Sequence, residues 1–193
     1  MEREDPMSAL LPVIETERLR LRALEVSDAD DMAANMTPAV ANWLASWPSP
    51  MSREAALARI ERSRAAIRAG GYAYYALIRR ADGRMIGGFG GGLVPEDRRR
   101  MEISYHLAED CHGQGLMREA SLAAVPMLWR LLPADVMEAG AQLGNEASFR
   151  VMQAMGMTPS EERLVYSSVR DRHEPTMFYE LRRPGGDATG GKS

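Results

Sequence analysis

The sequence has little cysteine, no long apolar run and no excess of positive charge. Its single cysteine, Cys111, excludes an intramolecular disulfide, and such a low number is typical of a reducing compartment. The apolar stretches are too short to span a bilayer, and we expect neither a signal peptide nor a membrane segment. With 24 Lys and Arg against 27 Asp and Glu, the net charge of −3 disfavours general nucleic-acid binding. These absences favour a cytoplasmic protein.

Length and composition indicate one domain with short flanking segments. The chain has 193 residues, of which 45% are hydrophobic and 26% are charged, as in a soluble globular domain. Residues 1–12 carry two prolines and no periodic pattern, so we expect a loose leader there. Residues 184–193, PGGDATGGKS, are rich in glycine and poor in apolar side chains, which predicts a disordered tail. The folded domain is therefore expected over residues 13–183.

Hydrophobic periodicity predicts alternating strands and helices across this domain. Strict alternation of Leu and Arg near residue 20 is typical of a half-buried strand, and the Asp82-Gly83 pair is typical of a tight hairpin. Early hairpins and late strand–helix–strand units indicate an α/β fold with a mixed sheet. We expect strands over 18–23, 72–79, 85–94, 98–107, 136–143, 163–169 and 176–182, helices capped by Ser27, Ser52 and Asn145, a helix over 113–131, and a loop over 36–51.

The most informative segment for function runs from Met101 to Ala120, where a predicted strand enters a glycine-containing loop that opens a helix. Glycines lack Cβ, so the backbone N–H groups of Gly113 and Gly115 can approach a ligand, and the helix N-terminus adds a positive dipole. This pattern predicts a pyrophosphate cradle, although a plain strand–helix turn is the alternative. A dinucleotide fingerprint would need glycine at Arg118, and the one Gly-Lys-Ser sequence lies in the tail.

Four segments, in order, resemble markers of the GNAT superfamily of N-acetyltransferases, closest to its RimJ/RimL-type branch. CHGQGLMREA is similar to the family's acyl-CoA pyrophosphate loop, and EAGAQLGNEASFRVMQAMGM is similar to its strand–Asn–helix marker. ETERLRLRAL near the start and MFYELRR near the end also resemble that branch. The resemblance covers residues 15–183. It implies the GNAT fold, in which helices flank a mixed, mostly antiparallel central sheet, and an acetyl-CoA-dependent transfer to a primary amine.

The resemblance also implies which residues hold acetyl-CoA. The backbone of Tyr105, His106 and Leu107 would pair with the pantetheine arm, in the splay between two central parallel strands. Asn145 would bind the cofactor arm or order the loop. The pyrophosphate would be wrapped by His112, Gly113, Gln114, Gly115, Leu116 and Met117.

Two residues receive catalytic roles from the resemblance, and no metal is expected. Glu102 would act as the general base that takes a proton from the substrate ammonium, directly or through water. Ser148 would lie near the thioester sulfur and protonate, or hydrogen-bond to, the departing thiolate. Because a thiol pKa is only about 8.5, a missing acid matters less than a missing base. The general acid is left open between Ser148, Tyr166 and none.

Departures from the family pattern keep other functions open. His112 stands at the usual Gln/Arg position, Met117 at a small-residue position, and Met152 where many members carry a tyrosine acid. They motivate the alternative of a non-catalytic acyl-CoA-binding or sensing module, and a different phosphate ligand at Gly113–Gly115 is a third possibility. The expected acceptor is a small-molecule amine or a protein N-terminus, and the chain is expected to be a monomer or a homodimer.

Overall fold

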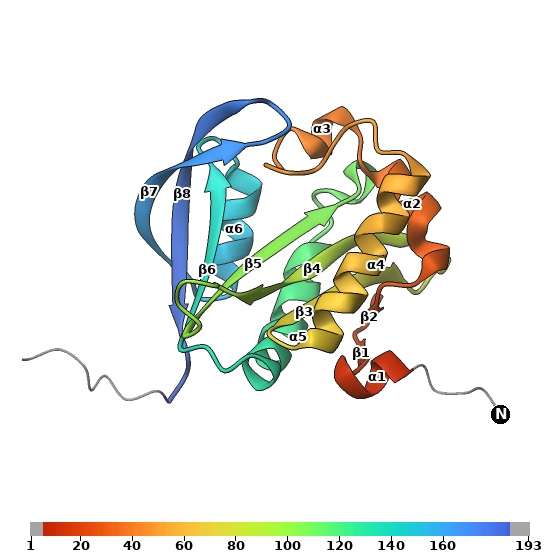
Figure 1. Ribbon diagram of the computed structural model, residues 1–193, viewed down its shortest axis with the longest axis horizontal. Helices are drawn as coiled ribbons and strands as arrows, with labels where there is room; N and C mark the ends of the chain where they lie inside the picture. The colour runs from red at the N-terminus through yellow and green to blue at the C-terminus, as the bar shows by residue number, and fades with distance from the viewer. Residues whose placement is uncertain (1–5, 186–193) are drawn as a thin grey trace, which may run out of the picture.

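The computed structural model describes residues 6–185 and contains one eight-stranded sheet in the order β1-β2-β3-β4-β5-β6-β8-β7 (Figure 1). Neighbouring strands are antiparallel except β5 and β6, which are parallel. The mixed, mostly antiparallel sheet expected from the sequence is therefore confirmed. The strands are β1 (Ile14–Glu15), β2 (Leu19–Ala23), β3 (Tyr72–Arg79), β4 (Met85–Leu93), β5 (Arg100–Leu107), β6 (Val136–Gln142), β7 (Thr158–Ser167) and β8 (Arg172–Arg182).

Helices cover both faces of the sheet. Side chains of successive strand residues point to opposite faces, and both faces carry apolar side chains that the helices bury. In β3, Tyr75 and Leu77 belong to the core that includes α5, whereas Tyr74 and Ile78 belong to a second core with α2 and α4. The helices are α1 (Pro6–Leu10), α2 (Ala29–Asn35), α3 (Pro38–Ala41), α4 (Arg53–Ala69), α5 (Leu116–Leu131) and α6 (Glu146–Ala154), with short 3₁₀ turns η1 (Val26–Asp28) and η2 (Glu109–Cys111).

Two of the expected helix caps are confirmed and one is wrong. The Ser52 hydroxyl accepts a hydrogen bond from the N–H of Ala55, and the Asn145 carboxamide accepts one from Ser148. Ser27 is not a cap, because it lies inside η1. Asp28 instead accepts a hydrogen bond from the Glu25 N–H and is held by Arg22, which explains why this carboxylate is buried.

Other differences lie at the two ends of the chain. The expected loose leader forms α1 over residues 6–10, and Met7 and Leu11 are each only 1% exposed. Two buried apolar side chains are too few to give a periodic pattern, so the sequence did not reveal this packing. The last two strands are longer than expected and meet in a tight turn at 168–171. Of the predicted disordered tail, residues 186–193 lie outside the described residues.

Candidate active site

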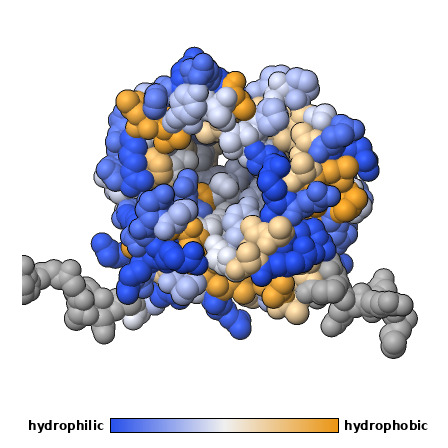
Figure 2. All heavy atoms as spheres, in the orientation of Figure 1, coloured by the Kyte–Doolittle hydropathy of each residue, from blue (hydrophilic) through white to orange (hydrophobic). Residues whose placement is uncertain are grey.

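The site begins where the two parallel strands separate. Strands β5 and β6 pair only from Arg100 to Glu102, against Val136 to Glu138. Beyond Glu102, β5 continues to Leu107 with β4 on one side alone. The other edge of β5 therefore presents backbone N–H and C=O groups that no strand satisfies, and unpaired backbone groups seek a partner. A cleft of about 710 Å³ opens at this point, and Figure 2 shows the hollow on this face.

The structure brings together most of the residues expected from the sequence. The expected residues that line the cleft are Glu102, Tyr105, His106, Leu107, His112, Gly113, Gly115, Leu116, Met117, Asn145 and Ser148. Gln114 is the exception, because it is outside the lining and its side-chain amide donates to the carbonyl of Asp110 at 2.9 Å. Any contact of Gln114 with a ligand would therefore come from its backbone.

The glycine loop forms an anion-binding geometry at the start of α5. Gly113 and Gly115 have φ angles of +73° and +75°, which side chains with a Cβ rarely adopt. Gly115 is the N-cap of α5, and a Cβ built on Gly113 would meet no atom within 4 Å. The first turn of a helix has unpaired N–H donors and the positive end of the dipole. This open cradle fits the pyrophosphate group that the sequence predicts.

Arg18, which precedes β2, holds the glycine loop and the first turn of α5 in place. Its guanidinium donates to Oε2 of Glu119 at 2.6 Å and to the carbonyl of Gln114 at 2.9 Å. Oε1 of Glu119 accepts further hydrogen bonds from the Arg18 N–H and from the Thr16 hydroxyl. The first turn of α5 is thus tied to the segment that leads into β2.

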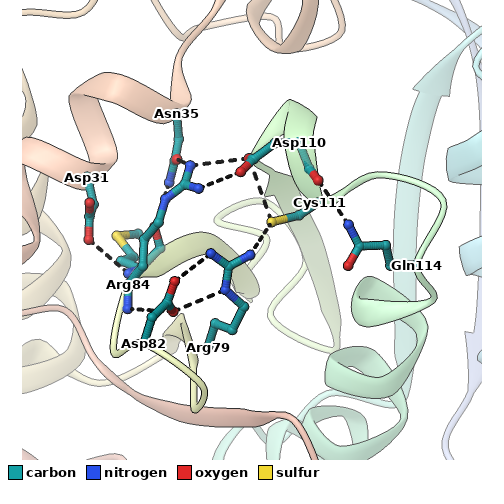
Figure 3. Close-up of polar contacts among 9 residues, drawn as sticks. Asp31, Asn35, Arg79, Asp82, Arg84, Asp110, Cys111 and Gln114 are labelled. Atoms are coloured by element: carbon teal, nitrogen blue, oxygen red, sulfur yellow. Dashed lines mark hydrogen bonds and ion pairs between the residues drawn. The ribbon is translucent and has the colours of Figure 1, made fainter.

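A polar network holds the other end of the same loop (Figure 3). Arg84 binds both carboxylate oxygens of Asp110, at 2.5 and 3.2 Å, and also contacts the amide oxygen of Asn35. Arg79 is paired with Asp82 and points an N–H at the sulfur of Cys111, 3.6 Å away. The turn of β3 and β4 therefore anchors η2, from which the loop continues.

Glu102 is the free carboxylate of the cleft. Among the described residues, no hydrogen bond or ion pair reaches it, and its side chain is exposed to the cleft. Desolvation raises the pKa of Glu102, and the neighbouring Glu138 carboxylate adds to the rise, while Arg163 opposes it. A carboxylate with a raised pKa is a stronger proton acceptor.

Ser148 lies across the splay from β5. The phenolic oxygen of Tyr105 lies 2.7 Å from its Oγ and also donates to its carbonyl at 3.2 Å. Tyr166 is placed elsewhere, since its phenol is bound to Asp171 near the end of the β7–β8 hairpin and is half exposed. Met152 is fully buried in the core and offers no acid. Of the two hydroxyl groups considered for the acid, the Ser148 hydroxyl is the one at the cleft.

His106 has an unusual environment that the sequence did not indicate. Its Nδ1 lies 3.2 Å from the Tyr74 hydroxyl, and its ring lies 4.6 Å from that of Trp47. Tyr74 reaches it across β4 because Gly88 has no side chain; a Cβ there would lie 2.4 Å from the Tyr74 oxygen. The Nε2 atom of His106 is buried without a partner. Desolvation lowers the pKa of His106 to about 4, so the ring is neutral at pH 7.

The segment expected as a loop over 36–51 contains α3 and roofs the cleft. Trp43 and Trp47 line the cleft from this segment. Arg170 in the β7–β8 turn donates to the carbonyls of Ala41 and Leu44, and Ser167 donates to that of Ala45. At its other end, α3 begins with Thr37, whose hydroxyl donates to Glu109 of η2. The roof is therefore tied to both sides of the cleft.

Two cations in the lining were missed from the sequence. Arg118 of α5 and Arg150 of α6 both line the cleft, and neither forms an ion pair with another described residue. Arginines without partners beside a helix N-terminus favour a polyanionic ligand. The available signal was their spacing: Arg118 follows Gly115 by three residues, and Arg150 follows Asn145 by five.

Two negative findings apply to residues 6–185. No helix in this range has the length and apolar character needed to cross a membrane. The same part of the chain holds no group of three or more His, Cys, Asp or Glu side chains arranged to bind a metal ion.

Comparison with known proteins gives one family and many structures of the same fold. The model of the acetyltransferase (GNAT) domain matches residues 18–158, whereas no curated protein matches in sequence. The RimL ribosomal L7/L12 alpha-N-protein acetyltransferase, in its apo form, has a TM-score of 0.75 and 19% identity, covering 90% of this chain and 95% of that one. The ribosomal-protein-S5-alanine acetyltransferase of Vibrio fischeri has a TM-score of 0.73 and 18% identity, covering 90% and 97%.

A third solved structure contains ligands. The microcin C7 self-immunity acetyltransferase MccE, in complex with acetyl-CoA and AMP, has a TM-score of 0.73 and 12% identity, covering 87% of this chain and 94% of that one. At such low identities, these likenesses establish the fold alone.

Proposed function

The chain belongs to the GNAT acetyltransferase family, and from this premise we propose that it transfers the acetyl group of acetyl-CoA to a primary amine by direct attack in a ternary complex. One observation carries the proposal: the free edge of β5, the glycine loop of α5 and the unpaired Glu102 carboxylate all face one cleft. The free strand edge and the glycine loop fit an elongated phosphorylated thioester, and the carboxylate fits an amine.

The cofactor assignment is a proposal for named residues. The backbone of Tyr105, His106 and Leu107 would bind the pantetheine arm along the free edge of β5. Asn145, the N-cap of α6, would bind the same arm or order the loop. The pyrophosphate would lie on His112 to Met117, with Arg118 and Arg150 balancing its charge. When bound, acetyl-CoA supplies an activated acetyl thioester.

Side chains of this protein would accept and donate the protons of the reaction. Glu102 accepts a proton from the substrate ammonium, which frees the nitrogen lone pair. Transfer would form a bond between the nitrogen and the acetyl carbon and break the carbon–sulfur bond, and the second proton lost by the nitrogen would pass to the departing thiolate to give a thiol. The Ser148 hydroxyl donates a hydrogen bond to the leaving sulfur, with Tyr105 fixing its position. Backbone N–H groups of β5 are the donors available to the carbonyl oxygen.

The acceptor is assigned by class. The names of two structural relatives refer to acetylation of ribosomal proteins, which favours a protein N-terminus as the amine. The roof supplies indole rings from Trp43 and Trp47, and Glu102 supplies negative charge, so the acceptor side suits a cationic amine with apolar neighbours. Small-molecule amines with the same features remain within the proposal.

A ligand panel tests the proposal. Thermal unfolding is measured with acetyl-CoA, CoA, ATP and NAD, and thiol release is followed with peptides bearing a free or a blocked N-terminus. A ligand at 100 times its Kd stabilises the folded state by about 2.7 kcal/mol, which is a shift of several degrees. We expect shifts with acetyl-CoA and CoA alone, and thiol release only with free amines. Binding without thiol release across the panel would favour the non-catalytic module, and the absence of any shift contradicts both.

A further inference from the structure

Three glutamates lie in register across three neighbouring strands. Glu102 of β5 is paired with Glu138 of β6, and Glu138 is paired in turn with Glu180 of β8. Register partners place their side chains on the same face, about 5 Å apart. Like charges directly opposite each other are unfavourable, so this row of carboxylates needs cations to compensate it.

The cations are distributed unevenly along the row. Arg100 of β5 is ion-paired with Glu180, and its Nε lies 3.7 Å from Oε2 of Glu138. Arg163 of β7 lies 3.4 Å from the same Glu138 oxygen and also binds Glu161 at 2.6 Å. Glu138 is 5% exposed and has two arginines, whereas Glu102 has no cation in direct contact among the residues described here.

The other charged side chains in the cleft lining are Glu174 and the two arginines without ion pairs, Arg118 of α5 and Arg150 of α6. Glu174 of β8 lines the cleft but is bound by Arg170 and Arg172. The cleft-lining residues of the roof are uncharged, and the β4 residue opposite Glu102 is Gly92. Glu138 and Arg163 are therefore the charges that act on Glu102, with opposite signs.

We propose that Glu138 is a positioning residue for catalysis: paired with Arg163 and Arg100, it places a carboxylate beside Glu102 and so strengthens Glu102 as the base. This inference rests on the proposed function, in which Glu102 takes the ammonium proton. A fixed anion makes a proton on Glu102 harder to remove, so the carboxylate accepts one more readily. Glu138 is buried and ion-paired, whereas Glu102 has no ion pair among the described residues.

The same arrangement defines the charge of the acceptor. Three carboxylates face two arginines, one of which is shared with Glu161, so the excess negative charge lies at the Glu102 end of the row. A low-dielectric cleft concentrates such a field. The row therefore favours acceptors that arrive as ammonium ions over neutral amines or alcohols.

The test uses variants that shift the titration of Glu102 in opposite directions. The Glu102 carboxyl is followed by carbon NMR of protein labelled at glutamate side chains, with its signal assigned from Glu102→Gln. We expect Glu138→Gln to lower the pKa of Glu102 by about one unit, a tenfold change, since a charge about 5–6 Å away is removed. Arg163→Gln should raise it. Glu161→Gln is the matched control, because Glu161 binds the same arginine, and it should leave Glu102 unchanged.

The pH dependence of turnover gives a second readout. The acid limb of kcat/KM should move to lower pH in Glu138→Gln and to higher pH in Arg163→Gln, whereas a purely structural role would lower activity in both without opposite shifts. Arg163 lies on the edge strand and is partly exposed, so its variant tests the proposal even if Glu138→Gln fails to fold. Unchanged Glu102 titration in the folded variants overturns the proposal. If no amine is acetylated, the proposed function fails, and the NMR titration still decides whether Glu138 acts on Glu102.

Discussion

The phenolic oxygen of Tyr105 on β5 lies 2.7 Å from the Oγ of Ser148 on α6. This contact links β5 to α6, the helix that follows β6. It lies beyond Glu102, where the backbones of β5 and β6 no longer pair. Burial raises the pKa of Tyr105 to about 12, so its hydroxyl stays protonated and can donate. Either hydroxyl can be the donor in this contact, and when Tyr105 donates, the Ser148 hydroxyl is free to donate to a third group in the cleft.

Replacing Ser148 should slow the chemistry without weakening cofactor binding. In Ser148→Ala we expect kcat to fall about tenfold, the effect of losing one hydrogen bond to a developing charge. Tyr105→Phe should cause a smaller loss, because Ser148 remains but is less well oriented. Tyr166→Phe serves as the control and should be neutral, since that phenol is bound to Asp171 away from the cleft. Equal losses in Ser148→Ala and Tyr166→Phe would contradict this assignment.

Removing the proposed base should have a larger effect. Glu102→Gln keeps the size of the side chain but cannot accept a proton, so we expect kcat to fall by about 10²–10⁴. The Kd for acetyl-CoA, measured by calorimetry, should stay within about twofold because the glycine loop is untouched. Glu161→Gln provides the control on the opposite side of Arg163. Full activity in Glu102→Gln would remove this residue from the mechanism.

The buried His106 should make the folded protein less stable as the pH is lowered. The pKa of its imidazole is lowered to about 4 in the folded state, against about 6.5 in an unfolded chain. Between these values the unfolded state binds more protons, so stability is lost as the pH falls from 6.5 toward 4. We expect a contribution of about 2 kcal/mol to the loss between pH 7 and pH 5. Urea unfolding of wild type and His106→Gln at both pH values measures it, and equal losses in the two proteins would refute it.

The anchor of the glycine loop should matter for acetyl-CoA binding more than for folding. The pair of Arg84 and Asp110 is partly exposed, so its loss should have little effect on stability. Arg84→Met should nevertheless raise the Kd for acetyl-CoA about three- to tenfold, because η2 loses its fixed position. Arg53→Met, which breaks an exposed pair with Asp30 remote from the loop, is the control. An unchanged Kd in Arg84→Met would show that the loop is held without this pair.

Most of the order of strands and helices, except α1, β1 and α3, was available from the sequence because it depends on short-range patterns. Alternating Leu and Arg, the Asp82-Gly83 turn, and the caps at Ser52 and Asn145 each act over a few residues, and each is found where it was expected. The glycine loop was visible for the same reason, since φ angles near +75° at Gly113 and Gly115 require the residue itself.

What only the tertiary structure decided is how distant residues meet. The sequence placed Glu102 on a strand, but the register that brings it beside Glu138 is set by strand pairing across more than thirty residues. No local pattern indicated that Tyr74 crosses Gly88 to reach His106, or that Arg84 holds the loop at Asp110. Such contacts depend on packing between elements that are remote along the chain, and local patterns carry no information on that packing. The sequence by itself determined most of the elements and the glycine loop, because these depend on neighbouring residues, whereas long-range packing determined the surroundings of Glu102.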